Sequence, residues 1–308
     1  MSNPRHFLTM DELTYDEQRH VLALAKKVKR DPAAYRSALT GKTLGMIFQK
    51  KSTRTRVSFE VGMYQLGGHA LFLSGNDIQI GRGETIADTS RVLSRYVDLL
   101  MARVYGHDDV EELARYSSVP VINGLSDLHH PCQVLADLQT IEERFGRLEG
   151  LHLAYVGDGN NMAHSLLLGC ARAGMSVSVA TARGYECNPE IVTRAKAHAA
   201  AYGQVVRTVY SPAEAVEGAD AVYTDVWASM GQEEEQEKRV KAFQGFEVNA
   251  ALMARANENA IFLHCLPAHR GEEVSAEVCD GPQSAIFDEA ENRLHAQKAL
   301  MLFVMGAA

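Results

Sequence analysis

Two patterns of hydrophobic positions alternate along the chain. Short apolar runs of strand length are followed by longer stretches in which apolar residues recur every three or four positions, as on one face of a helix. Near the start, Thr14 and Glu17 form a capping-box pair ahead of an apolar stripe at Val21, Leu24 and Val28. Strands that alternate with helices build parallel sheets flanked by helices, so the pattern predicts an α/β fold.

The strand candidates fall into two series. The first comprises 44–48, 70–73, 99–104 and 119–123, and the second comprises 151–157, 176–180, 205–209, 221–225 and 260–264. A helical segment at 131–144 lies between the series, and a segment with a glycine at each end, 146–150, follows it. We therefore expect two domains, residues 1–145 and 146–308, each a parallel sheet flanked by helices. A final helix from about residue 289 is expected to pack back on the first domain.

Length and composition agree with this division and exclude some classes of protein. A chain of 308 residues exceeds the size at which a single hydrophobic core stops growing. No run approaches the length of a membrane span, and the first residues lack the apolar segment of a secretion signal. We therefore expect no membrane partner and a cytoplasmic location.

Cysteine usage and charge narrow the expectation further. The five cysteines are scattered, without a Cys-x-x-Cys pair, which favours free thiols over a disulfide framework. The formal net charge of −8 opposes general binding to nucleic acid, so an anionic ligand would need a local basic patch.

Such a patch occurs at residues 50–56, Lys-Lys-Ser-Thr-Arg-Thr-Arg, between a strand candidate and a helical segment. A helix that begins here would direct backbone N–H groups and the positive end of its dipole at an anion. Hydroxyl and guanidinium groups add charge-assisted hydrogen bonds. The alternative is a solvated basic turn, but the hydroxyls at a strand-to-helix junction favour a phosphate site.

Two further segments place polar side chains after strands. His129-His130-Pro131-Cys132-Gln133 opens the helix after the fourth strand, and its imidazole and amide groups suit a carbonyl oxygen and an amine. His264-Cys265-Leu266-Pro267 lies at the carboxyl end of the last strand, where open α/β sheets bind ligands. His264, Cys265 and His269 are weak evidence for zinc, and we expect no metal and no cofactor.

Taken together, these motifs resemble the transcarbamoylase family, whose members share Ser-x-Arg-Thr-Arg and His-Pro-x-Gln. The order and spacing of the motifs match along nearly the whole chain. Within the family, the segment Asp-Val-Trp-Ala-Ser-Met-Gly from Asp225 and the His-Cys-Leu-Pro segment from His264 are similar to those of the ornithine carbamoyltransferases. The resemblance implies an enzyme that transfers the carbamoyl group of carbamoyl phosphate to the δ-amine of L-ornithine, giving L-citrulline and phosphate.

The resemblance also implies roles for individual residues. The carbamoyl phosphate set would comprise Ser52, Thr53, Arg54, Thr55, Gln79, Arg103, His130, Gln133, Cys265, Leu266 and Arg293. Of these, the catalytic residues would be Arg54, Arg103, His130, Gln133, Cys265 and Arg293. The ornithine set would comprise Asn161, Asp225, Ser229 and Met230. Gln79 would reach the phosphate of a neighbouring subunit, in a homotrimer or an assembly of trimers.

Other functions stay open at this point. A related transcarbamoylase acting on aspartate, N-acetylornithine or putrescine is one alternative. Aspartate and putrescine are disfavoured, because aspartate would bring a second carboxylate towards Asp225 and putrescine lacks the groups that Asn161 and Asp225 would bind. A nicotinamide-dependent dehydrogenase is suggested by Gly157-x-Gly159, but the third glycine position is Met162 and no acidic residue ends the next strand. A binding protein without turnover is the non-enzymatic alternative.

Overall fold

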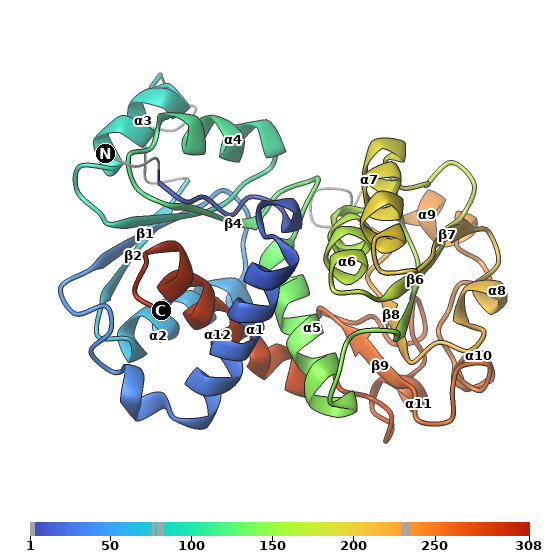
Figure 1. Cartoon of the computed structure of the whole chain (residues 1–308). Helices are drawn as coiled ribbons and strands as arrows, with labels where there is room; N and C mark the ends of the chain where they lie inside the picture. Colours follow the sequence, from blue (N-terminus) through green and yellow to red (C-terminus); the bar gives the residue numbers. More distant parts are fainter. Residues whose placement is uncertain (1–3, 76–77, 79–82, 229–234) are drawn as a thin grey trace. The chain divides into compact units, whose positions relative to one another are not determined.

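The chain forms two compact units, each built on one parallel sheet. The computed structural model describes residues 4–75, 78, 83–228 and 235–308. One unit consists of Met1–Gln139 and Asn292–Ala308, and the other of Thr140–Glu291. Both sheets are parallel and flanked by helices, which confirms the predicted fold class (Figure 1). The first division between the units falls inside helix α5, somewhat before the boundary predicted at 145–146.

The first unit carries a sheet with the strand order β2-β1-β3-β4. Its strands are β1 (Thr43–Phe48), β2 (His69–Ser74), β3 (Leu99–Arg103) and β4 (Val121–Leu125). Its helices are η1 (Met10–Glu12), α1 (Tyr15–Arg30), η2 (Pro32–Tyr35), α2 (Thr53–Gln65), α3 (Ile86–Leu93), α4 (His107–Tyr116) and most of α5 (Pro131–Phe145). Figure 1 shows α3 and α4 on one face of the sheet and α2 on the other, as right-handed crossovers require.

The second unit carries a sheet with the strand order β7-β6-β5-β8-β9. Its strands are β5 (His152–Val156), β6 (Ser176–Ala180), β7 (Val206–Val209), β8 (Ala221–Thr224) and β9 (Ile261–His264). Its helices are α6 (Asn161–Arg172), α7 (Pro189–Ala200), α8 (Pro212–Val216), α9 (Gln236–Ala242), α10 (Ala250–Met253) and α11 (Ala276–Cys279). Trp227, Phe243 and Phe246 pack with Val222 and Phe262 in a buried cluster on one side of this sheet.

Each strand order contains one point at which the chain reverses its direction across the sheet. In the first unit the reversal lies between β1 and β3, where Phe48 pairs with Arg103. In the second it lies between β5 and β8, where Val156 pairs with Thr224. The connections that follow the two strands at such a point run to opposite sides of the sheet. Their loops therefore diverge and leave a crevice at the carboxyl ends of the strands. The fold therefore provides one ligand position in each unit.

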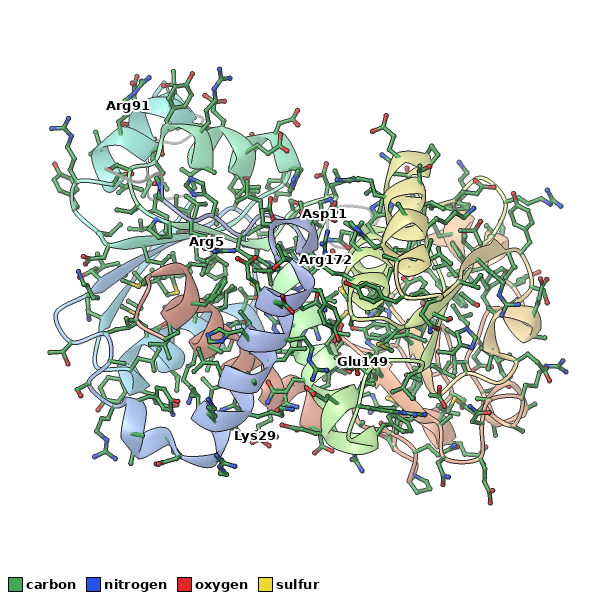
Figure 2. All side chains as sticks on the ribbon, viewed as in Figure 1. Arg5, Asp11, Lys29, Arg91, Glu149 and Arg172 are labelled. Atoms are coloured by element: carbon green, nitrogen blue, oxygen red, sulfur yellow. The ribbon has the colours of Figure 1, made fainter. Side chains whose placement is uncertain are left out.

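The last helix, α12 (Ile286–Val304), contacts several elements of the first unit. Lys29, near the end of α1 (Figure 2), donates to Asn292 at 2.8 Å, and Lys298 donates to Gln65 of α2 at 2.8 Å. The Arg5 guanidinium lies 4.4 Å from the ring centre of Phe303. Residues more than two hundred positions apart in the chain thus share one core.

Among the helices of the described residues, none combines the length and the apolar character that a membrane span requires.

Gly159 provides a test of the packing around the β5–α6 loop. A Cβ atom at this position would lie 2.4 Å from the backbone nitrogen of Cys187 and 2.6 Å from the carbonyl oxygen of Tyr185. Since backbone atoms cannot rotate away, we expect Gly159→Ala to lower the free energy of unfolding by about 1–3 kcal/mol. Gly106→Ala is the control, because no atom lies within 4 Å of its added Cβ. Urea unfolding of both variants measures the effect, and equal losses would contradict the described packing.

Candidate active site

The basic segment identified in the sequence lies where β1 ends and α2 begins. Ser52 is the N-cap residue of α2, and its Oγ accepts a hydrogen bond from the backbone N–H of Thr55 at 3.2 Å. The first turn of a helix presents unpaired N–H groups and a partial positive charge. Because this turn lies beside the β1–β3 switch point, the segment suits an anionic ligand.

A buried arginine joins three helices of the first unit. The Arg293 side chain, 2% exposed, donates through Nη1 to Gln133 Oε1 at 2.6 Å and through Nη2 to Thr55 Oγ1 at 3.2 Å. Its Nε donates to Gln297 Oε1 at 2.9 Å, and Gln297 Nε2 in turn donates to Ser58 Oγ at 2.8 Å. These three acceptors are neutral oxygens, and together they orient the plane of the guanidinium.

Burial and nearby positive charges lower the pKa values of His130 and Lys50. Burial holds the pKa of His130 well below its usual value of 6.5, and Arg293, Arg103 and Arg54 lower it further. Burial and the charge of Arg103 likewise lower the pKa of Lys50. His130 is therefore a neutral imidazole in a positively charged environment. Such an environment stabilises a negative charge that enters it.

In the second unit, polar side chains meet at the carboxyl ends of β5, β8 and β9. The Cys265 thiol donates to Asp225 Oδ1 at 3.1 Å, and Asn160 Nδ2 donates to Asp225 Oδ2 at 3.2 Å. Asn160 also caps α6, since its Oδ1 accepts from the backbone of Met162 at 2.9 Å. Asp225 is 6% exposed, so these hydrogen bonds fix a carboxylate in a shielded position suited to an ammonium group.

The turn after β9 is held by a second group of buried residues. His264 Nδ1 accepts from the backbone N–H of Leu266 at 2.9 Å, while His264 Nε2 lies 3.1 Å from Glu273 Oε1. Glu289 accepts from the His264 backbone at 3.0 Å and from the Tyr223 hydroxyl at 3.2 Å. Leu266 adopts a φ of 60°, so its carbonyl points in a direction that ordinary strand geometry would not give.

A buried ion pair connects the β5–α6 loop to α9. Arg239 Nη1 lies 2.6 Å from Asp158 Oδ2 and donates to the carbonyl oxygen of Trp227 at 2.9 Å. Burial raises the pKa of Asp158, against the opposing effect of Arg239. The ion pair therefore links the β5–α6 loop to α9, and these two segments flank the cluster of Asp225, Asn160 and Cys265.

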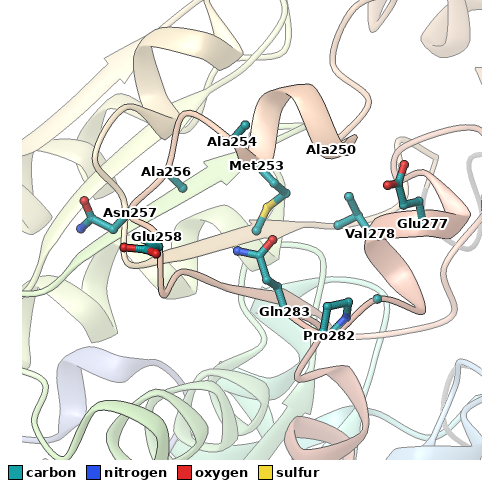
Figure 3. Close-up of a pocket in the computed structure, with 11 residues that line it drawn as sticks. Ala250, Met253, Ala254, Ala256, Asn257, Glu258, Glu277, Val278, Pro282 and Gln283 are labelled. Atoms are coloured by element: carbon teal, nitrogen blue, oxygen red, sulfur yellow. The ribbon is translucent and has the colours of Figure 1, made fainter.

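A hollow near α10 and α11 lies elsewhere in the second unit. Figure 3 shows its lining, which includes Met253, Val278 and Gln283 and encloses about 300 Å³. None of the residues that the sequence analysis selected lines it. Its two charged lining residues, Glu258 and Glu277, are both acidic, so the hollow suits an anionic ligand poorly.

Comparison with known families agrees with the division of the chain into two units. The carbamoyl-P binding domain of aspartate/ornithine carbamoyltransferase matches residues 5–143, and the Asp/Orn binding domain of the same enzymes matches residues 149–304. The chain belongs to the aspartate/ornithine carbamoyltransferase family. The family resemblance inferred from the motifs is thereby confirmed.

Individual members of the carbamoyltransferase family are similar along the whole chain. Ornithine carbamoyltransferase of Oceanobacillus iheyensis is 58% identical over 98% of this chain and 94% of its own length. The anabolic ornithine carbamoyltransferase of Pyrococcus furiosus is 55% identical over 98% of this chain and 96% of its own. The solved structure of the Pyrococcus furiosus enzyme has a TM-score of 0.95 and 54% identity, covering 99% of this chain and 98% of that one.

The carbamoyltransferase fold brings many of the predicted site residues together within each unit. In the first unit, hydrogen bonds join Arg293 to Thr55 and Gln133, and electrostatic interactions join His130 to Arg54 and Arg103. Ser52 and Thr53 form the start of α2. In the second, Cys265 contacts Asp225, Leu266 lies in the turn after β9, and Asn161 is the first residue of α6. Gln79, Ser229 and Met230 lie outside the described residues.

Sequence reasoning missed several residues that hold the site. Asn160, not its neighbour Asn161, makes the described hydrogen bond to Asp225, and its position before a helix was the available signal for a cap. Gln297 and Ser58 support Arg293 and Thr55, and Glu273 and Glu289 support His264. Gln297 lies one turn from Arg293 on α12, but the other contacts of these residues join separate segments, so no local pattern marks them.

Asp225, His264 and Cys265 could also be considered as metal ligands, since their ligating atoms lie within 4.8 Å of one another. Both ring nitrogens of His264 already interact, one with Leu266 and the other with Glu273. The Cys265 thiol is hydrogen-bonded to Asp225. A metal here would have to displace contacts that shape the turn after β9.

The lowered pKa of His130 has a measurable consequence. We expect its imidazole to stay neutral in the folded protein below about pH 6.5, where an ordinary imidazole is protonated, whereas in urea it should titrate near the ordinary value of about 6.5. Because the unfolded chain binds a proton at His130 more readily than the folded chain does, protonation favours unfolding. The contribution of neutral His130 to the free energy of unfolding is therefore complete above about pH 6.5 and declines as the pH falls below that value. NMR of the ring nitrogens, assigned with a His130→Gln variant, gives the measurement. Protonation of the folded-state imidazole near pH 6.5 would contradict the electrostatic description.

Proposed function

We propose that the chain transfers the carbamoyl group of carbamoyl phosphate to the δ-amine of L-ornithine, producing L-citrulline and phosphate. The observation that carries the proposal is the match of both halves of the chain to the two domains of the family, together with relatives named ornithine carbamoyltransferase at 55–59% identity. The positively charged region of the first unit and the shielded carboxylate of the second have the chemistry that these two substrates need.

The first unit, with the predicted domain 1–145 and the helix from about 289, would hold carbamoyl phosphate. Ser52, Thr53, Arg54 and Thr55 at the start of α2, together with Arg103, would bind the phosphate. Neutral His130 and Thr55 would donate to the carbonyl oxygen, and Gln133 would accept from the carbamoyl amine. Arg293 would orient Thr55 and Gln133 and place its positive charge near the developing oxyanion. Gln79 would complete the phosphate contacts from a neighbouring subunit.

The second unit, with the predicted domain 146–308, would hold ornithine. Asp225 would pair with the α-ammonium group, Asn161 with the α-carboxylate, and Ser229 and Met230 would close over the substrate. Cys265 and the carbonyl oxygen of Leu266 would lie near the attacking nitrogen. The Cys265–Asp225 hydrogen bond at 3.1 Å supports this assignment, because it places the thiol beside the carboxylate that would fix the amino acid.

In the proposed reaction a neutral δ-amine attacks the carbonyl carbon, and the tetrahedral intermediate expels phosphate. Amines of this type have a pKa of about 10, so the ammonium must lose a proton on binding or attack, and the rate should rise with pH. The departing phosphate would accept a proton. Each fixed cationic donor near the oxyanion would contribute on the order of 10² to 10³ in kcat.

We further propose that the protein acts as a homotrimer or an assembly of trimers. β2 is an edge strand of the first sheet, and its Leu71 and Phe72 side chains are 40% and 38% exposed. The Arg56 guanidinium lies 3.7 Å from the Phe72 ring centre, and Tyr64 on the same helix is 79% exposed. An exposed apolar edge strand is normally covered by a partner, which supports a subunit contact here.

The cellular role proposed is arginine biosynthesis in the cytoplasm. The Pyrococcus furiosus relative, 55% identical, is named as anabolic. The scattered free cysteines suit a reducing compartment.

The choice of amine acceptor tests the proposed function. We expect kcat/KM with L-ornithine to exceed that with L-aspartate by at least about 10²-fold, because a second carboxylate near Asp225 is repelled while an ammonium is attracted. Release of phosphate from carbamoyl phosphate measures turnover with both acceptors on the same scale. Faster turnover with aspartate would reject the assignment of acceptor. Binding of ornithine without turnover, seen by calorimetry, would indicate a binding protein instead.

A further inference from the structure

A turn beyond the proposed ornithine site brings one imidazole and two carboxylates together. The ligating atoms of His269, Glu272 and Glu273 all lie within 4.8 Å of one another. The turn is closed by backbone hydrogen bonds from Glu272 to His269 at 3.0 Å and from Gly271 to Val274 at 2.8 Å. These hydrogen bonds hold the three residues within one short turn.

Glu273 supplies the observation that points to a ligand. Its side chain is fully buried, and Oε1 receives hydrogen bonds from His264 Nε2 at 3.1 Å and from the His269 backbone at 2.6 Å. Among the described residues, no hydrogen bond reaches its other oxygen, Oε2. This oxygen lies 3.9 Å from His269 Nδ1 and so borders the space between the three side chains. A buried carboxylate oxygen without a partner is costly, and a cation would remove that cost.

The distances suit a small divalent ion after a minor adjustment. His269 Nδ1 lies 3.8 Å from Glu272 Oε2. Ligands of a tetrahedral first-row ion at bonds of about 2.1 Å are separated by about 3.4 Å. The side chains of His269 and Glu272 are 45% and 40% exposed, so they can move by a few tenths of an ångström. Their exposure also leaves room for water on the remaining coordination positions.

Two arginines on adjoining segments are engaged by other carboxylates. Arg270 donates to both oxygens of Asp280, at 2.8 and 2.6 Å. Arg239 is paired with Asp158 and Glu235. Glu272 accepts a weak hydrogen bond from the neutral amide of Gln236 at 3.4 Å. Two carboxylates and one imidazole thus form a locally anionic set of donors.

We propose that His269, Glu272 and Glu273 form a binding site for a first-row divalent cation such as Mn²⁺ or Zn²⁺. Imidazole combined with carboxylates favours these ions, whereas Mg²⁺ and Ca²⁺ prefer oxygen ligands alone. The site is distinct from the Asp225, His264 and Cys265 cluster, which would offer a thiolate.

Titration of the full-length protein with Mn²⁺ tests the proposal, with free Mn²⁺ counted by electron paramagnetic resonance. We expect one site per chain, and Glu272→Gln and His269→Asn should each weaken binding by about tenfold or more. Both residues are partly exposed, so neither substitution should disturb the fold. Glu277→Gln is the matched control, since it removes the same charge from an exposed residue of α11 and should leave the affinity unchanged.

Three results would overturn the proposal. Absence of Mn²⁺ binding at millimolar concentrations would exclude the site. Equal affinity of the wild type, Glu272→Gln and His269→Asn would place any bound ion elsewhere. Loss of binding in Cys265→Ser, with binding retained in Glu272→Gln, would assign the ion to the thiolate cluster.

Discussion

The first unit depends on the placement of one positive charge in its interior. Arg293, fully buried in α12, binds Gln133 of α5 and Thr55 of α2, and Gln297 one turn further along orients its Nε. A buried guanidinium is unfavourable unless its hydrogen bonds are satisfied, and removal of its partners would leave a charge in a poorly polar environment. The contacts therefore fix the rotation of three helices at once. The two partner side chains, Thr55 and Gln133, are the ones that would touch the carbamoyl group.

The same charge sets the chemistry available at this position. Burial lowers the pKa of His130, and the charges of Arg293, Arg103 and Arg54 lower it further. The neutral imidazole can then donate a hydrogen bond without adding a further repulsive charge. The second unit has the opposite polarity, with Asp225 held by Cys265 and Asn160. One unit is thus prepared for an anion and the other for an ammonium group. Preorganised charges of this kind need little rearrangement when the transition state forms, and that is why they lower its free energy.

Much of this arrangement was predictable from the sequence. Every predicted strand exists within a few residues, because apolar runs bounded by helical segments leave few alternatives, and the basic segment 50–56 marks the start of α2. The supporting residues were not predictable. Gln297 and Glu289 bind Ser58 and His264, which only folding brings near. The position of Asn160 before α6 marks it as a cap but does not indicate its hydrogen bond to Asp225. Local chemistry identifies candidate ligands, but their orientation is decided by tertiary contacts.

We propose that the directed hydrogen bonds of Arg293, and not its charge alone, prepare the first unit for carbamoyl phosphate. The decisive measurement is calorimetric titration of carbamoyl phosphate into wild-type and Arg293→Lys protein, after circular dichroism has established that both are folded. Lysine keeps the charge but cannot bind three separate acceptors in one plane, so affinity should fall by about tenfold or more. Unchanged affinity in the folded variant would show that the charge alone is sufficient.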